Sequence, residues 1–201
     1  MTREAGAAPI DDVLDETRAW LKSVVVGLGL CPFAQASITA GGLKMLRCDA
    51  TDPEELAAAL RNALLELRTD AGKAFDGYLV VHPNVLTEFE SFNDFLDHAD
   101  EILEETPRSG EFQIASFHPD YRFAETQPDD VGNYTNRSPY PMLHILREAS
   151  VERALANFGD PAKIPERNVE QLESLGLDAV KKLLASCKRR DRLQAPKRRQ
   201  L

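Results

Sequence analysis

The chain has 201 residues, of which 43% are hydrophobic and 28% charged, and its formal net charge is −9 at pH 7. This length favours one domain with one sizeable core, and the acidic balance argues against general nucleic-acid binding, which needs a broad basic surface. The longest apolar run near the amino terminus, residues 24–32, is too short to span a bilayer, so we expect neither nucleic acid nor membrane as a partner.

The cysteines and the charge distribution indicate a compartment and a domain layout. Cys31, Cys48 and Cys187 form no close pair, and residues 1–10 lack a signal-peptide pattern, so we expect a cytoplasmic protein. Residues 188–201 hold seven Lys/Arg and one Asp, whereas the preceding 187 residues hold 17 basic and 32 acidic side chains. We interpret 188–201 as a basic, flexible tail, 1–9 as a disordered N-terminus and 10–187 as a single α/β domain.

Apolar periodicity predicts alternating helices and strands in the first half of the chain. The predicted helices cover residues 10–28, 52–67 and 87–105, and the predicted strands cover 43–48, 77–81 and 111–117. Asp11 or Asp12 caps the first helix, and Thr51 or Asp52 caps the second ahead of Pro53.

The sequence of the second half of the chain predicts further helices. Ser138 and Pro139 resemble a helix cap and first turn, and they predict a helix over residues 139–158. Further helices are predicted at 166–174 and 177–190. Strands separated by helices favour an α/β fold, with a small sheet of three to four strands covered by helices. The alternative is an α+β, ferredoxin-like mixed sheet with an extra strand around residues 37–42.

The densest group of His, Asp, Tyr, Asn and Arg lies in residues 117–147, and it indicates a functional loop. His82 and His118 each end a predicted strand and precede a proline. Parallel strands would bring both to the carboxyl edge of the sheet, where α/β proteins bind ligands. We interpret His118 as a general acid/base that Asp120 orients or assists, whereas a structural role is the stronger interpretation of His82.

Helical spacing places His144, a second candidate catalytic residue, one turn from Arg147 on the predicted helix. Arg137 beside the helix start and Arg147 would together hold a carboxylate or phosphate. The alternative is internal pairing of Arg147, with Asp129, Asp130 or the neighbours of Glu148, and a loop-clamping role for Arg137. We expect His118, Asp120, Arg137, His144 and Arg147 to converge on one cleft. The other candidate ligand-binding residues are Tyr121, Asn133, Asn136, Ser138 and Cys31.

Cys31 could act as a nucleophile with His118 or His144 as its base. It is predicted to follow a helix C-terminus, however, where the dipole disfavours a thiolate. We therefore expect Cys31 to be buried or semi-buried and chemically quiet. His82, His118 and His144 could also bind catalytic zinc or iron, but no HxxxH or HxH spacing supports this, so no metal ligand or cofactor is assigned.

Four segments resemble a known family: GLCPFA (29–34), FHPDYRFAET (117–126), DDVGNYTNRSPYPMLHILREASVERAL (129–155) and IPERN (164–168). They are similar to the bacterial domain of unknown function 1415 family, over about residues 10–185. The resemblance implies a single-domain bacterial cytosolic protein and carries no reaction with it.

The leading functional hypothesis is an enzyme that acts on a small anionic metabolite, a carboxylate or phosphate, with His118 as general acid/base. The first alternative is a non-catalytic regulatory module that binds a ligand or a protein. The second is a metal-dependent enzyme that uses His82, His118 and His144. The sequence does not indicate an oligomeric state.

Overall fold

A computed structural model of the chain describes residues 11–105, 110–156 and 160–188. The interpretations of residues 1–9 as a disordered N-terminus and of the chain beyond Lys188 as a flexible tail lie outside these described residues.

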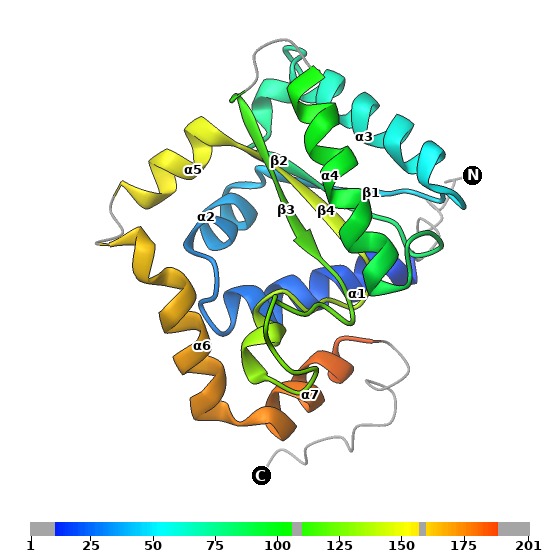
Figure 1. Cartoon of the computed structure of the whole chain (residues 1–201). Coiled ribbons are helices and arrows are strands. Elements are labelled where there is room, and N and C mark those ends of the chain that lie inside the picture. The colour runs from blue at the N-terminus through cyan, green and yellow to red at the C-terminus, as the bar shows by residue number, and fades with distance from the viewer. Residues whose placement is uncertain (1–10, 106–109, 157–159, 189–201) are drawn as a thin grey trace, which may run out of the picture.

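The architecture is α/β, with one mixed sheet of four strands (Figure 1). The strands are β1 (Leu43–Arg47), β2 (Gly77–Val81), β3 (Phe112–Phe117) and β4 (Met142–Arg147). Their order across the sheet is β1-β2-β4-β3. β1 pairs with β2 in parallel, whereas β4 runs antiparallel to both of its neighbours. β2 and β3 therefore point the same way and end at the same edge of the sheet.

Helices surround the sheet and connect its strands. The α-helices are α1 (Asp12–Trp20), α2 (Pro32–Ala40), α3 (Pro53–Leu67), α4 (Phe89–Glu105), α5 (Glu148–Leu155), α6 (Ile164–Leu175) and α7 (Leu177–Ser186). A π-helical segment, η1 (Leu21–Val26), continues α1, and short 3-10 segments lie at η2 (Gly72–Ala74), η3 (Val131–Thr135) and η4 (Pro161–Lys163). None of the helices in the described ranges is long and apolar enough to cross a membrane.

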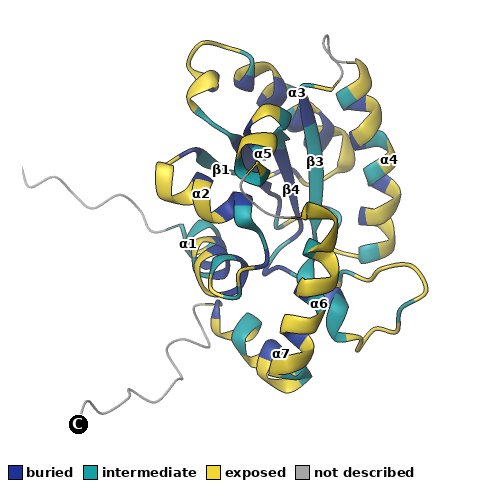
Figure 2. Ribbon diagram, turned by 90° about the vertical axis from the view of Figure 1, so that its left-hand side faces the viewer, coloured by how far each residue is buried: buried dark blue, intermediate teal, exposed yellow. Residues whose placement is uncertain are grey.

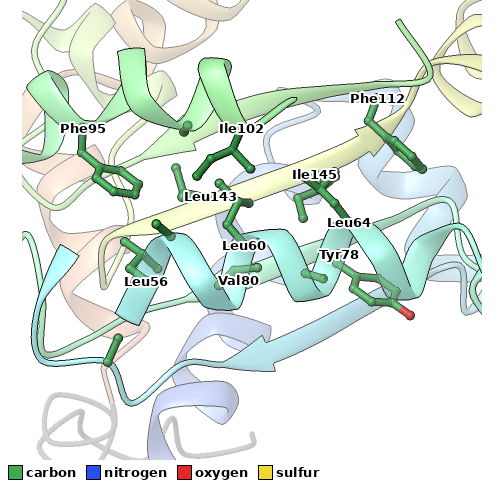
Figure 3. Packing of buried hydrophobic residues seen from close by; sticks show 14 of the residues in the cluster. Leu56, Leu60, Leu64, Tyr78, Val80, Phe95, Ile102, Phe112, Leu143 and Ile145 are labelled. Carbon is green, nitrogen blue, oxygen red and sulfur yellow. The ribbon is translucent and has the colours of Figure 1, made fainter. Parts of the chain in front are cut away.

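The sheet separates two hydrophobic cores (Figure 2). On one face, α3 and α4 pack over the strands, and Leu143 and Ile145 of β4 point into their core (Figure 3). On the other face, α1, η1, α2 and α7 cover the strands, and Met142 points toward them. Because successive side chains of a strand alternate between its faces, each residue of β4 is assigned to one of these cores.

Local capping chemistry explains why the predicted helices begin where they do. The carboxylate of Asp11 accepts hydrogen bonds from the backbone N–H groups of Val13 and Leu14 at the start of α1. Asp52 accepts from the N–H of Glu55 at the start of α3, with Pro53 as its first residue. Each cap satisfies N–H groups that have no partner within the helix. Both caps were among the predicted residues.

The predicted helix over residues 139–158 is wrong in its first half. Residues 142–147 form β4, and the helix there, α5, begins only at Glu148. β4 lies between two other strands and has helices over both faces, so its side chains are largely buried on both sides, and all of them except His144 and Arg147 are apolar. A short run that is apolar on both sides has no period-2 alternation to distinguish it from a buried helix.

The predicted α/β sheet of three to four strands is confirmed. The extra strand around residues 37–42, which belonged to the alternative ferredoxin-like sheet, does not form. That segment contains the last turn of α2 and its C-terminal cap, Gly41, which has a left-handed φ of 71°. A residue in this conformation ends a helix by turning the chain, and glycine adopts it without steric cost.

Candidate functional site

A hollow of about 580 Å³ opens between β3, the turn before α2, the end of η3 and α6. We call it the apolar hollow. The residues that line it are Val25, Leu30, Cys31, Ala115, Phe117, Phe123, Thr135, Asn136, Pro165, Glu166, Asn168 and Val169. Most of these side chains are apolar, and a few polar groups interrupt them, which is the usual composition of a small-molecule site.

The hollow exists because α6 is fastened to the turn that precedes α2. The buried side chain of Asn168 donates a hydrogen bond of 2.7 Å from Nδ2 to the carbonyl oxygen of Leu30. Arg167 donates to the carbonyl of Gly29, whose left-handed φ of 66° reverses the chain after η1. Residues almost 140 positions apart in the sequence therefore form adjacent walls.

Cys31 is the N-terminal cap of α2, and its Sγ accepts a hydrogen bond from the N–H of Ala34 at 3.4 Å. The prediction that Cys31 is buried or semi-buried is confirmed, because the residue is half-buried. The reasoning behind that prediction was incomplete, since Cys31 also begins a helix, whose dipole favours a thiolate. Burial has the larger effect and raises the pKa of the thiol, although the N–H groups of Ala34 and Phe33 act in the opposite direction. Its reactivity stays a prediction.

His144 lies on β4, on the face of the sheet where the apolar hollow opens. It is paired across the sheet with Ala115, a wall residue of the apolar hollow, and its ring centroid lies 6.1 Å from that of Phe33. The imidazole is buried, and its Nε2 has no hydrogen-bond partner among the described residues. Burial alone lowers the pKa of His144 to about 4, so the ring is neutral at pH 7.

His118 lies on the other face of the sheet, with His82. The ring of Phe92 in α4 lies near both, with centroid distances of 5.1 Å to His118 and 5.9 Å to His82. Both histidines emerge at the edge where β2 and β3 end, as predicted for parallel strands. Both are buried, and burial is the largest cause that lowers the pKa of each, to about 4 for His82.

Asp120 contacts the His118 ring through its backbone N–H group, not through its carboxylate. The N–H of Asp120 donates to Nδ1 of His118 at 3.0 Å, which leaves the proton of the neutral ring on Nε2. The carboxylate of Asp120 nevertheless acts in the direction that raises the pKa of His118. Tyr121 packs its ring against Phe89 and Phe123, at centroid distances of 5.3 and 5.0 Å.

Two other predicted site residues hold the loop at 119–130 in place. Asn133 is buried, accepts hydrogen bonds from the backbone of Phe123 and the hydroxyl of Thr126, and donates to the carbonyl of Gln127. Arg137 donates from Nε to the carbonyl of Tyr121 and from Nη2 to that of Pro128. These contacts support the alternative interpretation of Arg137 as a loop clamp.

Arg147 lies at the opposite end of β4 from this loop. Its guanidinium donates to Oε1 of Glu111 at 2.8 Å and to the carbonyl of Leu67 at 2.7 Å, and it lies 4.9 Å from the centroid of the Phe112 ring. The predicted anion clamp of Arg137 with Arg147 is therefore wrong, because Arg147 is committed to contacts inside the fold. Internal pairing, the alternative role, is observed, but its partner is Glu111 and not Asp129, Asp130 or a neighbour of Glu148.

The single cleft predicted for five residues does not form. His118 and His144 lie on opposite faces of the sheet, and Arg147 lies at the far end of β4, where it pairs with Phe112. The same separation removes the metal site of His82, His118 and His144, and within residues 11–105, 110–156 and 160–188 no group of three His, Cys, Asp or Glu side chains could hold a metal ion.

Of the predicted site residues, Cys31 and Asn136 do line one hollow. Asn136 donates from Nδ2 to the carbonyl of Ser116 and accepts at Oδ1 from the hydroxyl of Thr135. Ser138 lies outside this hollow, and its buried hydroxyl donates to the carbonyl of Tyr140. The sequence-based choice of residues missed Glu166 and Asn168. The segment IPERN, part of the resemblance to a known family, was the signal that could have identified them.

Comparison with known proteins identifies a matching family but no individual relative. The model of the family described as protein of unknown function (DUF1415) matches residues 12–182. No curated protein and no solved structure matches the chain.

Proposed function

The chain belongs to this family of proteins of unknown function, and from its own geometry we propose that it binds a small, mainly apolar molecule in the apolar hollow. The proposal rests on one observation, which is that separate segments of the chain meet at a single cavity. All four segments that resemble the family, residues 29–34, 117–126, 129–155 and 164–168, contribute side chains to this one cavity. A cavity of about 580 Å³ lies in the size range of small-molecule sites.

Exposed apolar surface at the hollow supports an apolar ligand. Phe123 is 40% exposed, although it is a large aromatic side chain, and it lines the hollow together with Phe117, Leu30 and Val169. Covering such surface stabilises a complex by roughly 25 cal/mol per Å² of apolar area removed from water. The loop that carries Phe123 is held by Asn133, so this surface is ordered before a ligand binds.

The polar groups of the hollow favour a ligand that donates hydrogen bonds. The side-chain amides of Asn136 and Asn168 already donate to carbonyl groups of the protein, and the single proton of the Thr135 hydroxyl is shared between the carbonyl of Gly132 and Oδ1 of Asn136. Glu166 adds a carboxylate, which only accepts when ionised. The lining therefore offers acceptors in excess, and an amine or hydroxyl on an otherwise apolar molecule would complement it.

Binding without catalysis is the function that this geometry supports best. His118, the proposed general acid/base, is buried on the other face of the sheet and is not among the residues that line the hollow. The thiol of Cys31 has a raised pKa and stays protonated at pH 7, so it serves as part of the wall. We keep the cytoplasm as the expected compartment, because three cysteines that form no disulfide suit reducing conditions.

The fluorescent probe 1-aminoanthracene tests the proposal, because it is an uncharged aromatic molecule that carries one amine donor. We expect saturable binding with a blue shift of its emission. Ala115→Trp should weaken binding at least tenfold by filling the hollow from β3. Phe123→Ser should weaken it several-fold, and this residue is exposed enough for the fold to tolerate the change.

Leu65→Ser is the matched control, since Leu65 is a 57% exposed apolar residue on α3 that does not line the hollow. It should leave the affinity unchanged. The absence of saturable binding to the native protein would overturn the proposal. Unchanged affinity in both folded hollow variants would do the same.

A further inference from the structure

A second, smaller hollow of about 290 Å³ lies between the β3–η3 loop, the chain that enters β4, and α7. We call it the basic hollow. The residues that line it are Pro119, Tyr134, Arg137, Ser138, Pro139, Lys181, Leu184, Ala185 and Lys188. It shares no lining residue with the apolar hollow.

Three cationic side chains, Arg137, Lys181 and Lys188, contribute to this one concavity. The nearby counter-charge is Asp129, whose carboxylate lies 2.8 Å from Nζ of Lys181. Both members of this pair are largely exposed, so the pair is worth little in free energy, and Lys181 can also contact another anion. A basic concavity contrasts with the acidic balance of the whole chain, whose net charge is −9.

Arg137 is already oriented for a ligand. Its guanidinium lies 4.3 Å from the centroid of the Tyr134 ring and donates two hydrogen bonds to loop carbonyls. Three of its five N–H groups remain beyond these two contacts. A guanidinium held by stacking and by hydrogen bonds loses little side-chain entropy when an anion arrives.

The two lysines approach from the other wall. Lys181 lies on α7, and Nζ of Lys188, just beyond the end of that helix, lies 5.5 Å from the centroid of the Tyr140 ring. The pKa of Lys181 is raised, mainly by its hydrogen bond with Asp129, while the positive charge of Arg137 acts in the lowering direction, so the two cations repel each other. An anion between them would relieve this repulsion.

We propose that the basic hollow binds the phosphoryl group of a small molecule. Cations that converge from separate walls suit a tetrahedral dianion, whose oxygens point in several directions. A planar carboxylate is matched by a single guanidinium fork, whereas two of the three cations here are lysines, which act as point charges from a different wall, and Nε of Arg137 already donates to the carbonyl of Tyr121. The proposal is independent of the ligand proposed for the apolar hollow.

Calorimetric titration with inorganic phosphate at constant ionic strength tests the proposal, with sodium chloride as the balancing salt. We expect saturable phosphate binding. The double variant Lys181→Ala/Lys188→Ala should bind phosphate at least tenfold more weakly, and Lys181→Arg should keep most of the affinity because it keeps the charge.

Lys182→Ala is the matched control, because Lys182 is the exposed neighbour of Lys181 on α7 and does not line the basic hollow. It should leave phosphate affinity unchanged, and so should Phe123→Ser in the apolar hollow. Melting temperatures without phosphate confirm that each variant is folded.

Three outcomes would overturn the proposal. The first is a heat signal that is equal for phosphate and chloride. The second is native affinity in the folded double variant. The third is capture of the protein by vesicles of phosphatidylcholine and phosphatidylglycerol without any response to free phosphate, because this result would assign the cations to a membrane surface.

Discussion

His118 and His144 lie on opposite faces of the sheet. His118 packs against Phe92 of α4, and His144 packs against Phe33 at the start of α2. Both are buried, and the pKa of each is lowered by burial. The two rings therefore cannot form one acid–base pair, and each contributes to a different core.

Stability should fall as the pH is lowered, because His144 is neutral in the fold. Its pKa is about 4 in the folded chain and about 6.5 when unfolded, so between these values the unfolded state binds more protons. The stabilising contribution is complete above pH 6.5 and is lost as the pH falls toward 4, where the loss approaches roughly 3 kcal/mol. Urea unfolding at several pH values measures it.

His144→Leu should make that pH dependence shallower, since leucine does not titrate. His98, which lies 3.0 Å from Glu101 and whose side chain is 38% exposed, supplies the control variant His98→Gln, and this change should alter the slope less than His144→Leu does. An identical slope in native protein and His144→Leu would show that His144 is not the titrating group.

Arg147→Ala should destabilise the fold by about 2–4 kcal/mol. The substitution removes the guanidinium from the carbonyl of Leu67 and from Oε1 of Glu111, and it leaves that half-buried carboxylate with only the longer contact of 3.5 Å to Arg68. Losing charge-assisted hydrogen bonds in a partly buried site is costly. Arg147→Lys should recover little, because an ammonium cannot reach both acceptors with the geometry of a guanidinium. Chemical unfolding measures both variants.

Arg61→Ala is the control for Arg147, because Arg61 forms an exposed ion pair with Glu105 at 3.9 Å. Its loss should change the free energy of unfolding by no more than about 0.5 kcal/mol. If Arg147→Ala were as stable as the native protein, its contacts inside the fold would not explain why this arginine is present.

Gly77→Ala should destabilise the sheet. Gly77 begins β2, and a Cβ built there would overlap the carbonyl oxygen of Ile145 in the neighbouring β4. Because that oxygen belongs to the backbone of a central strand, relief requires the strands to move apart. We expect a loss of more than about 1 kcal/mol, measured by thermal or urea unfolding.

Gly132→Ala is the comparison, since its Cβ would meet only the side chain of Val169 at an ordinary contact distance of 3.4 Å. It should be close to neutral. Equal effects at Gly77 and Gly132 would contradict the close approach of β2 and β4 as the cause.

Cys31 should react slowly with iodoacetamide at pH 7, because its raised pKa keeps the thiolate scarce. We expect a rate below that of reduced glutathione, and a rate that still increases with pH beyond pH 9, because burial raises the pKa of the Cys31 thiol. Peptide mapping by mass spectrometry separates it from Cys48 and Cys187. Alkylation of Cys31 faster than glutathione at pH 7 would instead indicate an activated thiol, and 1-aminoanthracene should then be tested as a protecting ligand.

Local signals in the sequence determined most of the helices and three of the strands. Asp11 and Asp52 begin helices because their carboxylates satisfy free N–H groups within a few residues. Such effects need no knowledge of the rest of the chain. The α/β fold class follows from the alternation of these elements.

Only the tertiary structure decided which candidate functional side chains lie close together. β4 is largely buried on both sides, so its nature depends on the strands and helices around it, and its register sets the face on which His144 lies. The wall between Leu30 and Asn168 joins residues 138 positions apart through one buried hydrogen bond. The partners of Arg137 in the basic hollow, Lys181 and Lys188, come from a later helix and from the chain just beyond it. Contacts at such separations depend on how the whole chain packs, and no local pattern encodes them.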